Sequence, residues 1–201
     1  MYTIHTIDAY ILSVAQRKES DSLLICISDD YGLMYVNVQG ARKEVSKHRF
    51  VAQPYTFARI TCVEGKVGWR LTGIAEIEKI NTNFQVLPLF VRAGQLINKM
   101  VHGEEKGSLY SALYGAYTSI SLIIGMREEK NKVFNEDELG AIERIIVLRI
   151  LHRLGYIGQS SLIEPFLELD EIIQQTIEHV ILHKKTITSI INISLRASGL
   201  S

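Results

Sequence analysis

Basic side chains are concentrated in one segment of this chain, residues 42–70. The segment holds seven lysines and arginines against two acids, Glu44 and Glu64, which gives a balance of +5. Residues 1–41 hold two bases and five acids, a balance of −3. Lysine and arginine neutralise phosphates, so such a cluster predicts a polyanionic ligand such as a nucleic acid. The whole chain has 22 basic and 22 acidic residues, so the surface must be local.

Aromatic residues lie among these cations. Tyr55, Phe57 and Arg59 alternate in an apolar run, and alternate residues of a strand share a face, as do Arg70 and Thr72 in the next run. Rings stack on unpaired bases while cations bind the phosphates. An interior position for Tyr55 and Phe57, and an ordinary solvated loop for residues 42–49, remain alternatives. We expect a DNA-contacting surface made of Arg42, Lys43, Lys47, Arg49, Arg59, Arg70, Tyr55 and Phe57.

No residues have the spacing of a known catalytic motif. The chain lacks a nucleophile elbow, a Walker-type loop, an HExxH sequence and an EF-hand loop. His179 and His183 are one helical turn apart, but without a third ligand nearby a surface pair is favoured over a metal site. Cys26 and Cys62 lie in apolar runs, which predicts buried, reduced thiols. We therefore expect no enzyme activity, no cofactor and no metal.

The first eighty residues must position the basic segment, and they have the pattern of β-strands. Turn residues at Asp29-Asp30-Tyr31-Gly32 and at Glu64-Gly65-Lys66 predict two tight hairpins, and a long polar loop runs from Gly40 to Gln53. The expected strands are Ile7 to Ala15, Ser22 to Ser28, Leu33 to Val38, Tyr55 to Val63 and Val67 to Ile77. Five strands in this arrangement predict a closed barrel of the OB type. An SH3-like barrel has a similar strand count and remains an alternative.

The apolar period changes to that of helices after Glu78. The first helix is expected over Asn83 to His102, and Ser108 is the expected N-cap of a second that ends near Gly125. Asn135 should cap a third helix that ends at Gly155. Two more are expected over residues 168–196, with a break at residues 184–186. The fold class is therefore α+β, with an OB-type barrel in residues 1–80 and a helical domain in residues 81–201.

The longest uncharged stretch, Gly107 to Met126, has the length of a membrane span. Its serines, glycines and tyrosines favour a buried helix over a span. The first ten residues carry Asp8 and no basic region, unlike a signal peptide. We therefore expect no membrane association and a cytoplasmic location.

Eight short segments of the chain, taken in order, form a recognisable pattern. They are Asp8-Ala9-Tyr10-Ile11-Leu12, Glu19-Ser20-Asp21, Tyr31-Gly32-Leu33, Gln39-Gly40-Ala41-Arg42-Lys43, Ser46-Lys47-His48-Arg49-Phe50, Gln53-Pro54-Tyr55, Leu71-Thr72-Gly73-Ile74-Ala75-Glu76 and Leu151-His152-Arg153-Leu154-Gly155-Tyr156. No single motif is diagnostic, but in their order and spacing these segments resemble the RecO family of bacterial recombination mediators.

The resemblance implies an OB barrel, a helical domain and a function in DNA repair and homologous recombination. It implies binding of single- and double-stranded DNA, annealing of complementary strands and a nucleoid-associated location. It also implies that the protein acts in partnership with RecR and binds the C-terminal tail of single-strand binding protein. Together these interactions would assist the loading of RecA, which would be an indirect partner.

Two departures from the family pattern bear on function. Many relatives carry a four-cysteine zinc site after the Leu-Gly-Tyr helix end, whereas no cysteine follows Cys62 here. The chain is also short for the family and has no net charge. An alternative function is therefore a protein-interaction adaptor that has an OB fold and binds DNA weakly or not at all.

Overall fold

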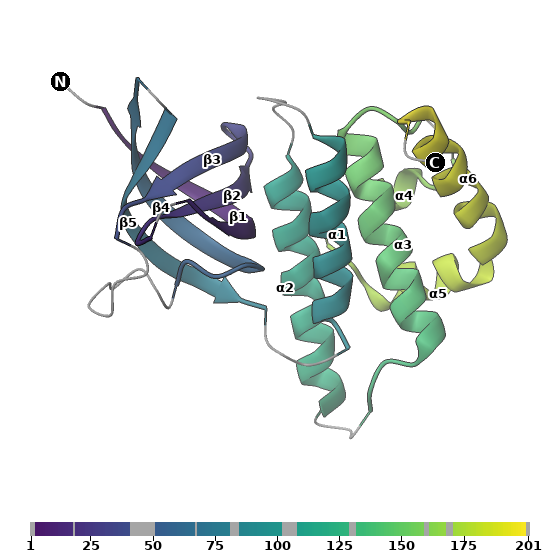
Figure 1. Cartoon of the computed structure of the whole chain (residues 1–201). Coiled ribbons are helices and arrows are strands. Elements are labelled where there is room, and N and C mark those ends of the chain that lie inside the picture. Colours follow the sequence, from purple (N-terminus) through teal and green to yellow (C-terminus); the bar gives the residue numbers. More distant parts are fainter. Residues whose placement is uncertain are drawn as a thin grey trace. The chain divides into compact units, whose positions relative to one another are not determined.

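The computed structural model describes residues 3–17, 19–40, 51–66, 68–80, 85–101, 108–128, 132–158, 161–167 and 171–199. These residues form a closed five-stranded barrel followed by a helical region (Figure 1). The predicted α+β class, with a barrel first and helices after it, is confirmed. The chain divides into two compact units: Met1–Asn81 with Gly94–Tyr110, and Thr82–Ala93 with Ser111–Ser201.

The barrel strands follow the order β1-β2-β3-β5-β4, and β4 closes onto β1. Their bounds are β1 Ile4–Gln16, β2 Ser22–Ser28, β3 Gly32–Val38, β4 Thr56–Gly65 and β5 Gly68–Lys79. Strand β5 lies between β3 and β4; it runs parallel to β3 and antiparallel to β4. This Greek-key order is OB-like, and it distinguishes between the two barrel types that the strand pattern left open.

Alternate residues of the strands fill the barrel interior. The buried cluster comprises Ile7, Ala9, Ile11, Leu24, Cys26, Met34, Val36, Val38, Ala52, Ala58, Ile60, Cys62 and Leu71. Both thiols are buried and free, as the sequence predicted. Burial raises the pKa of Cys26 to about 12 and that of Cys62 to about 11, so both stay protonated and weakly nucleophilic at neutral pH.

A second apolar cluster lies on the outer side of β1 and β4, within the first unit. The rings of Tyr10 and Phe57 are 4.7 Å apart, and Tyr110 meets Phe57 edge-on at 5.9 Å. Gly94 approaches the same cluster, because a Cβ there would stand 3.4 Å from a methyl group of Leu12. Part of the barrel's outer face is therefore covered.

Six helices follow in the described residues, and some of their ends match local sequence signals. Their bounds are α1 Leu87–Met100, α2 Leu109–Glu128, α3 Glu136–Arg153, α4 Glu164–Leu167, α5 Gln174–Leu182 and α6 Lys184–Ala197. Asn135 is the N-cap of α3, as the sequence predicted. It also forms a capping box with Glu138, which was not predicted. Gly155 has a φ of 77° just after α3, the left-handed conformation that commonly ends a helix.

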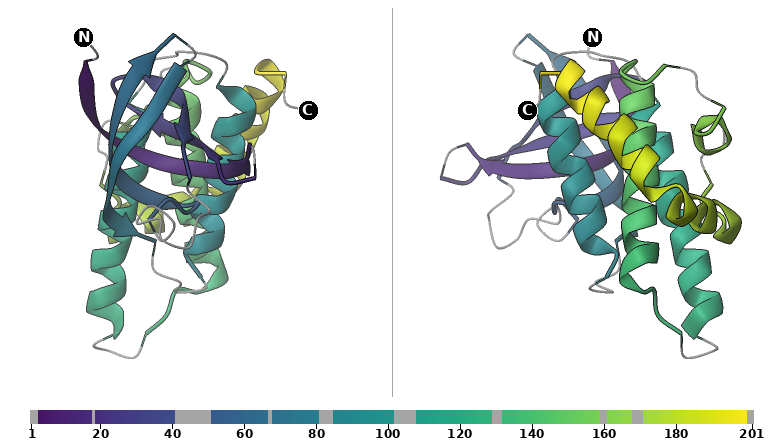
Figure 2. Two further views of the ribbon diagram at one scale, coloured as in Figure 1. Left: turned by 60° about the vertical axis from the view of Figure 1, so that its left-hand side comes forward. Right: turned by 90° about the vertical axis from the view of Figure 1, so that its right-hand side faces the viewer.

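A buried arginine connects α3 to α4 and to the residue Glu171 that precedes α5. Arg149 of α3 is 2 % exposed, and its guanidinium donates to the main-chain oxygens of Phe166 at 2.9 Å and Glu171 at 2.7 Å. Helix α6 crosses α3 in the same unit (Figure 2). The short helix α4 was not predicted.

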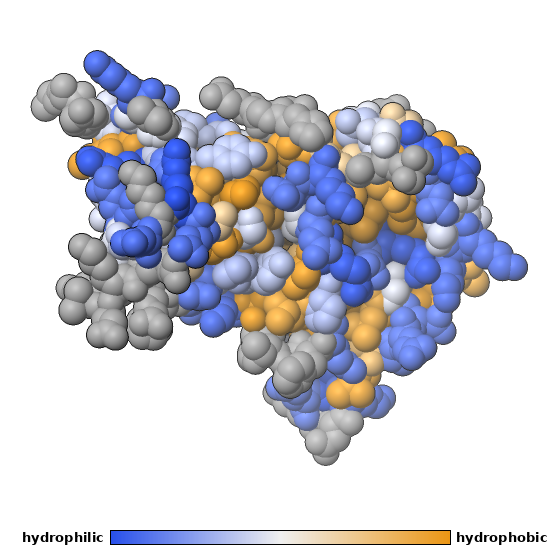
Figure 3. Space-filling view, viewed as in Figure 1, coloured by the Kyte–Doolittle hydropathy of each residue, from blue (hydrophilic) through white to orange (hydrophobic). Residues whose placement is uncertain are grey.

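Helix α2 is the one described helix that is long and apolar enough to cross a membrane. Core helices of soluble proteins pass the same test, so this is weak evidence for a span. The helix is buried along its first part, including Leu113 and Ile120, whereas Leu122 and Met126 near its end are more than half exposed. Hydrophobic side chains are visible over the helices in Figure 3.

Candidate nucleic-acid interface

A groove of about 440 Å³ lies on the outer side of the barrel, entirely within the first unit. The connection between β1 and β2 contributes Arg17 and Asp21, and the turn between β4 and β5 contributes Lys66. Asn37 of β3 and Arg70 of β5 form its floor. We call this the basic groove. OB barrels bind oligonucleotides on this face, between the loops that join strands 1 to 2 and 4 to 5.

The floor of the basic groove is set by the pairing of β3 with β5. Asn37 is opposite Arg70 in the parallel register. Val36 and Val38 are buried in the barrel core, so the Asn37 side chain between them faces outward. Arg70 likewise precedes the core residue Leu71 and is exposed.

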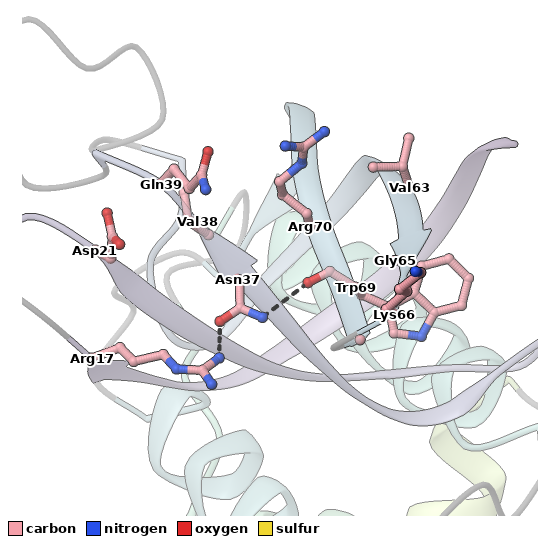
Figure 4. A pocket seen from close by; sticks show the side chains of 11 residues that line it. Arg17, Asp21, Asn37, Val38, Gln39, Val63, Gly65, Lys66, Trp69 and Arg70 are labelled. Atoms are coloured by element: carbon pink, nitrogen blue, oxygen red, sulfur yellow. Dashed lines mark hydrogen bonds between the residues drawn. The ribbon is translucent and has the colours of Figure 1, made fainter. Parts of the chain in front are cut away.

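Hydrogen bonds hold the two sides of the groove in place (Figure 4). Arg17 donates to the side-chain oxygen of Asn37, and the amide nitrogen of Asn37 donates to the main-chain oxygen of Trp69 at 3.2 Å. The carboxylate of Asp21 accepts from the main-chain nitrogen of Gly40 at 2.9 Å. Because Asp21 binds main chain, it fixes the β1–β2 connection to the end of β3.

The indole of Trp69 packs against the barrel core. It makes edge contacts with Tyr31 at 5.0 Å and His5 at 5.2 Å between ring centroids. The hydroxyl of Tyr31 is 2.8 Å from Nδ1 of His5. Tyr31 and Trp69 both pack against the barrel core, and Trp69 also lines the basic groove.

The basic groove carries an excess of positive charge. Arg17, Lys66 and Arg70 face a single acid, Asp21, among its lining residues, a balance of +2. Within the part of the chain that the structure describes, none of the three cations forms an ion pair. Their charge is therefore available to an anionic ligand.

The predicted DNA-contacting cations have three different outcomes. Arg70 lines the basic groove. Arg59 lies on β4 and forms a bidentate ion pair with Asp8 of β1, at 2.6 and 2.9 Å, which raises the pKa of its guanidinium and compensates its charge. The four loop cations Arg42, Lys43, Lys47 and Arg49 lie outside the described residues, so their role stays a prediction.

The prediction that the ring of Phe57 stacks on bases disagrees with the structure. Phe57 shares the outer face of β4 with Arg59, as predicted, but it is 0 % exposed beneath Tyr10 and Tyr110. The alternative prediction placed the Phe57 ring inside the barrel. The ring is buried, as that alternative requires, but it lies on the outer face of β4. Tyr55 precedes β4 with a φ of 61°, and its main-chain nitrogen donates to Ile11 at 2.7 Å. It is half-buried, and its ring lies near Gly94.

Sequence reasoning did not place Arg17, Asn37 or Lys66 in the DNA-contacting surface. Arg17 belongs to the acidic part of the chain, and Lys66 was counted in the basic segment but treated as a turn residue. An available signal was the barrel type itself, because in an OB barrel the first and fourth connections flank one face.

Features of catalytic or metal sites are sparse in the described residues. No three side chains among their histidines, cysteines, aspartates and glutamates come together as metal ligands. The rings of His179 and His183 are 4.5 Å apart and form a pair on α5 and its end. No protein-family model matches the chain, and no curated protein matches it.

Proposed function

We propose that the barrel binds nucleic acid through the basic groove. The observation that carries this proposal is the location of three cations, Arg17, Lys66 and Arg70, on the face that OB barrels use for oligonucleotides. None of the three forms an ion pair with another described residue. Side chains from two connections and two strands converge there, so a phosphate would meet donors from both sides. Contacts of this kind are to phosphates and do not depend on base sequence.

The resemblance to RecO extends this proposal to a mediator of DNA repair and recombination. Such a protein binds single- and double-stranded DNA and anneals complementary strands, and neutralising phosphates lowers the repulsion between two strands. In this role it acts with RecR on strands coated by single-strand binding protein, contacts that protein's C-terminal tail and assists RecA loading. The loop cations 42–49 would extend the phosphate-binding surface.

The triple variant Arg17→Ala, Lys66→Ala and Arg70→Ala tests the proposal. Each phosphate contact on a single strand contributes roughly −0.7 to the slope of log affinity against log salt. If each cation meets one phosphate, the slope should become shallower by about 2. Fluorescence anisotropy with a labelled oligonucleotide at several salt concentrations measures it. Equal slopes in the variant and the parent would place binding elsewhere, and thermal unfolding should change little because exposed charges contribute little to stability.

Arg59 provides a matched control on the same barrel. The double variant Asp8→Asn with Arg59→Gln removes an ion pair and leaves the net charge unchanged. Because Asp8 already compensates Arg59, we expect affinity for single strands within about twofold of the parent and an unchanged salt slope. The same anisotropy titration measures this. A loss of affinity comparable to that of the triple variant would show that Arg59 contacts DNA despite its partner.

The adaptor alternative is favoured by one observation on the second unit. A groove of about 700 Å³ there is lined by Ile123, Met126 and Val133, with Arg127 and Lys132 beside them. Met126 and Val133 are 61 % and 74 % exposed, and exposed apolar patches rimmed by polar groups are often protein-binding surfaces. An adaptor would show no salt-dependent binding to oligonucleotides, so the titration above separates the two functions.

A further inference from the structure

Tyr35 is the one exposed aromatic residue on the barrel strands that the structure describes. Its side chain is 49 % exposed, whereas Tyr10 and Phe57 are fully buried and Trp69 is half-buried. Tyr35 makes no ring contact or side-chain hydrogen bond with the described residues. A half-exposed tyrosine presents a large apolar ring and a polar hydroxyl at the surface.

The register places Tyr35 next to the basic groove. Met34 and Val36 are in the barrel core, so Tyr35 and Asn37 share the outer face of β3, about 6.7 Å apart along the strand. Across the strand pair Tyr35 is opposite Ile25, and Asn37 is opposite Leu23. Both β2 residues are half-buried, so Tyr35 has apolar neighbours across the strand pair. Asn37, on the same face of β3, lines the basic groove.

We propose that Tyr35 is the stacking platform for an unpaired base, while the basic groove holds an adjacent phosphate. The face formed by Tyr35, Ile25, Leu23 and Asn37 would then select single strands over duplexes. The bases of a duplex are already stacked on one another, so only an unpaired base offers its flat face to a ring. This inference rests on the proposed nucleic-acid binding and adds the form of nucleic acid and the residue that distinguishes it.

The strand-2 and strand-3 face is also where OB barrels place oligonucleotides. The distance from Tyr35 to Asn37, roughly 6.7 Å, can be spanned by one nucleotide between its base and its phosphate. The cations supply salt-dependent affinity for any strand, whereas the ring supplies affinity only where a base is free. The two contributions are therefore separable by changing the ligand or the ring.

The test compares three labelled ligands of equal length: a thymidine strand, an abasic strand and a duplex. We expect the parent to bind the thymidine strand about tenfold more tightly than the abasic strand, since one base–aromatic stack contributes a factor of roughly 5 to 150. Tyr35→Leu should bind the thymidine strand about tenfold more weakly than the parent and the abasic strand equally well. Tyr35→Phe should behave as the parent, because it keeps the ring.

Tyr156 provides a matched control, since it is 37 % exposed and belongs to the second unit. Tyr156→Leu should leave all three affinities unchanged. Trp69 is the chain's single tryptophan and lines the basic groove, so its emission reports whether the groove is occupied. Binding of either single strand should change that emission in the parent and in Tyr35→Leu alike.

Two failures would have different meanings. If strands bind with a steep salt dependence but Tyr35→Leu equals the parent on the thymidine strand, the stacking role is wrong and the proposed function stands. If no ligand binds in a salt-dependent manner, the proposed function and this inference both fail. The parent's preference for bases over abasic sugars tests the inference even if Tyr35→Leu does not fold, because equal affinities would overturn it.

Discussion

Replacing Phe57 by alanine should lower the free energy of unfolding by about 3–5 kcal/mol, the range measured for large-to-small changes at buried aromatic residues. Phe57 has no exposed surface, and its ring contacts those of Tyr10 and Tyr110. Alanine would leave a cavity on the outer side of β4 and remove both ring contacts. Urea unfolding followed by circular dichroism measures the change.

Phe57→Leu and Tyr35→Ala are the controls for this prediction. Leucine refills most of the space, so its cost should be well below that of alanine. Tyr35 is an aromatic residue of a neighbouring part of the barrel but is half exposed, so its replacement should change stability far less. The prediction would be contradicted if Phe57→Ala kept the parent's stability and lost affinity for single strands, because the ring would then be a ligand contact.

Local signals predicted most of the secondary structure. The turn at Asp29-Asp30-Tyr31-Gly32 ends β2 and begins β3, and Gly32 adopts a φ of 62° there. The N-cap at Asn135 begins α3 as expected. Such features depend on residues within a few positions of each other, so the sequence alone specifies them.

Non-local pairing set the limits of prediction. The insertion of β5 between β3 and β4 places Asn37 opposite Arg70 in the parallel register. Nothing within the sequence of either strand predicts this pairing. Alternation correctly placed Phe57 and Arg59 on one face, but it could not show that Tyr110 covers the first or that Asp8 pairs with the second. The alternation of residues along a strand predicts which side chains share a face of the sheet. Which residues cover that face depends on the tertiary fold.

The basic groove follows the same rule. Counting charge along the chain favoured residues 42–70 and set Arg17 apart, yet barrel closure brings Arg17 to Lys66 and Arg70. The charge count also included Arg59 as a full positive charge, although its ion pair with Asp8 compensates that charge. Net charge per segment therefore does not show which cations the fold brings together or which of them already form an ion pair.

Glu138 should contribute the largest single electrostatic stabilisation among the described ion pairs. Its carboxylate accepts two hydrogen bonds from Arg127, at 2.6 and 2.9 Å, and one from the main-chain nitrogen of Asn135 at 2.9 Å. The side chains of Glu138 and Arg127 are only 12 % and 17 % exposed. Arg127 also donates to Gln174 and lies over the ring of Phe134. This ion pair therefore connects α2, α3 and α5.

The hydrogen bonds from Arg127 are the main cause that lowers the pKa of Glu138, from 4.5 to about 2. A carboxyl group whose pKa is lower in the folded state stabilises the protein fully above the unfolded value of about 4.5, and the contribution is lost as pH falls toward about 2. At 1.36 kcal/mol per pKa unit, the contribution at neutral pH is at most about 3 kcal/mol.

Glu138→Gln should therefore lower the free energy of unfolding by up to about 3 kcal/mol at pH 7. Glutamine retains the capping box geometry, so the change isolates the charge. The difference between parent and variant should shrink between pH 4.5 and pH 2 and vanish below it, as urea unfolding at these pH values would show. Asp137→Asn is the control, because its pair with Lys184 has side chains 63 % and 51 % exposed and should contribute about 0–1 kcal/mol. A Glu138→Gln deficit that persists unchanged at pH 2 would mean that packing, and not the ion pair, causes it.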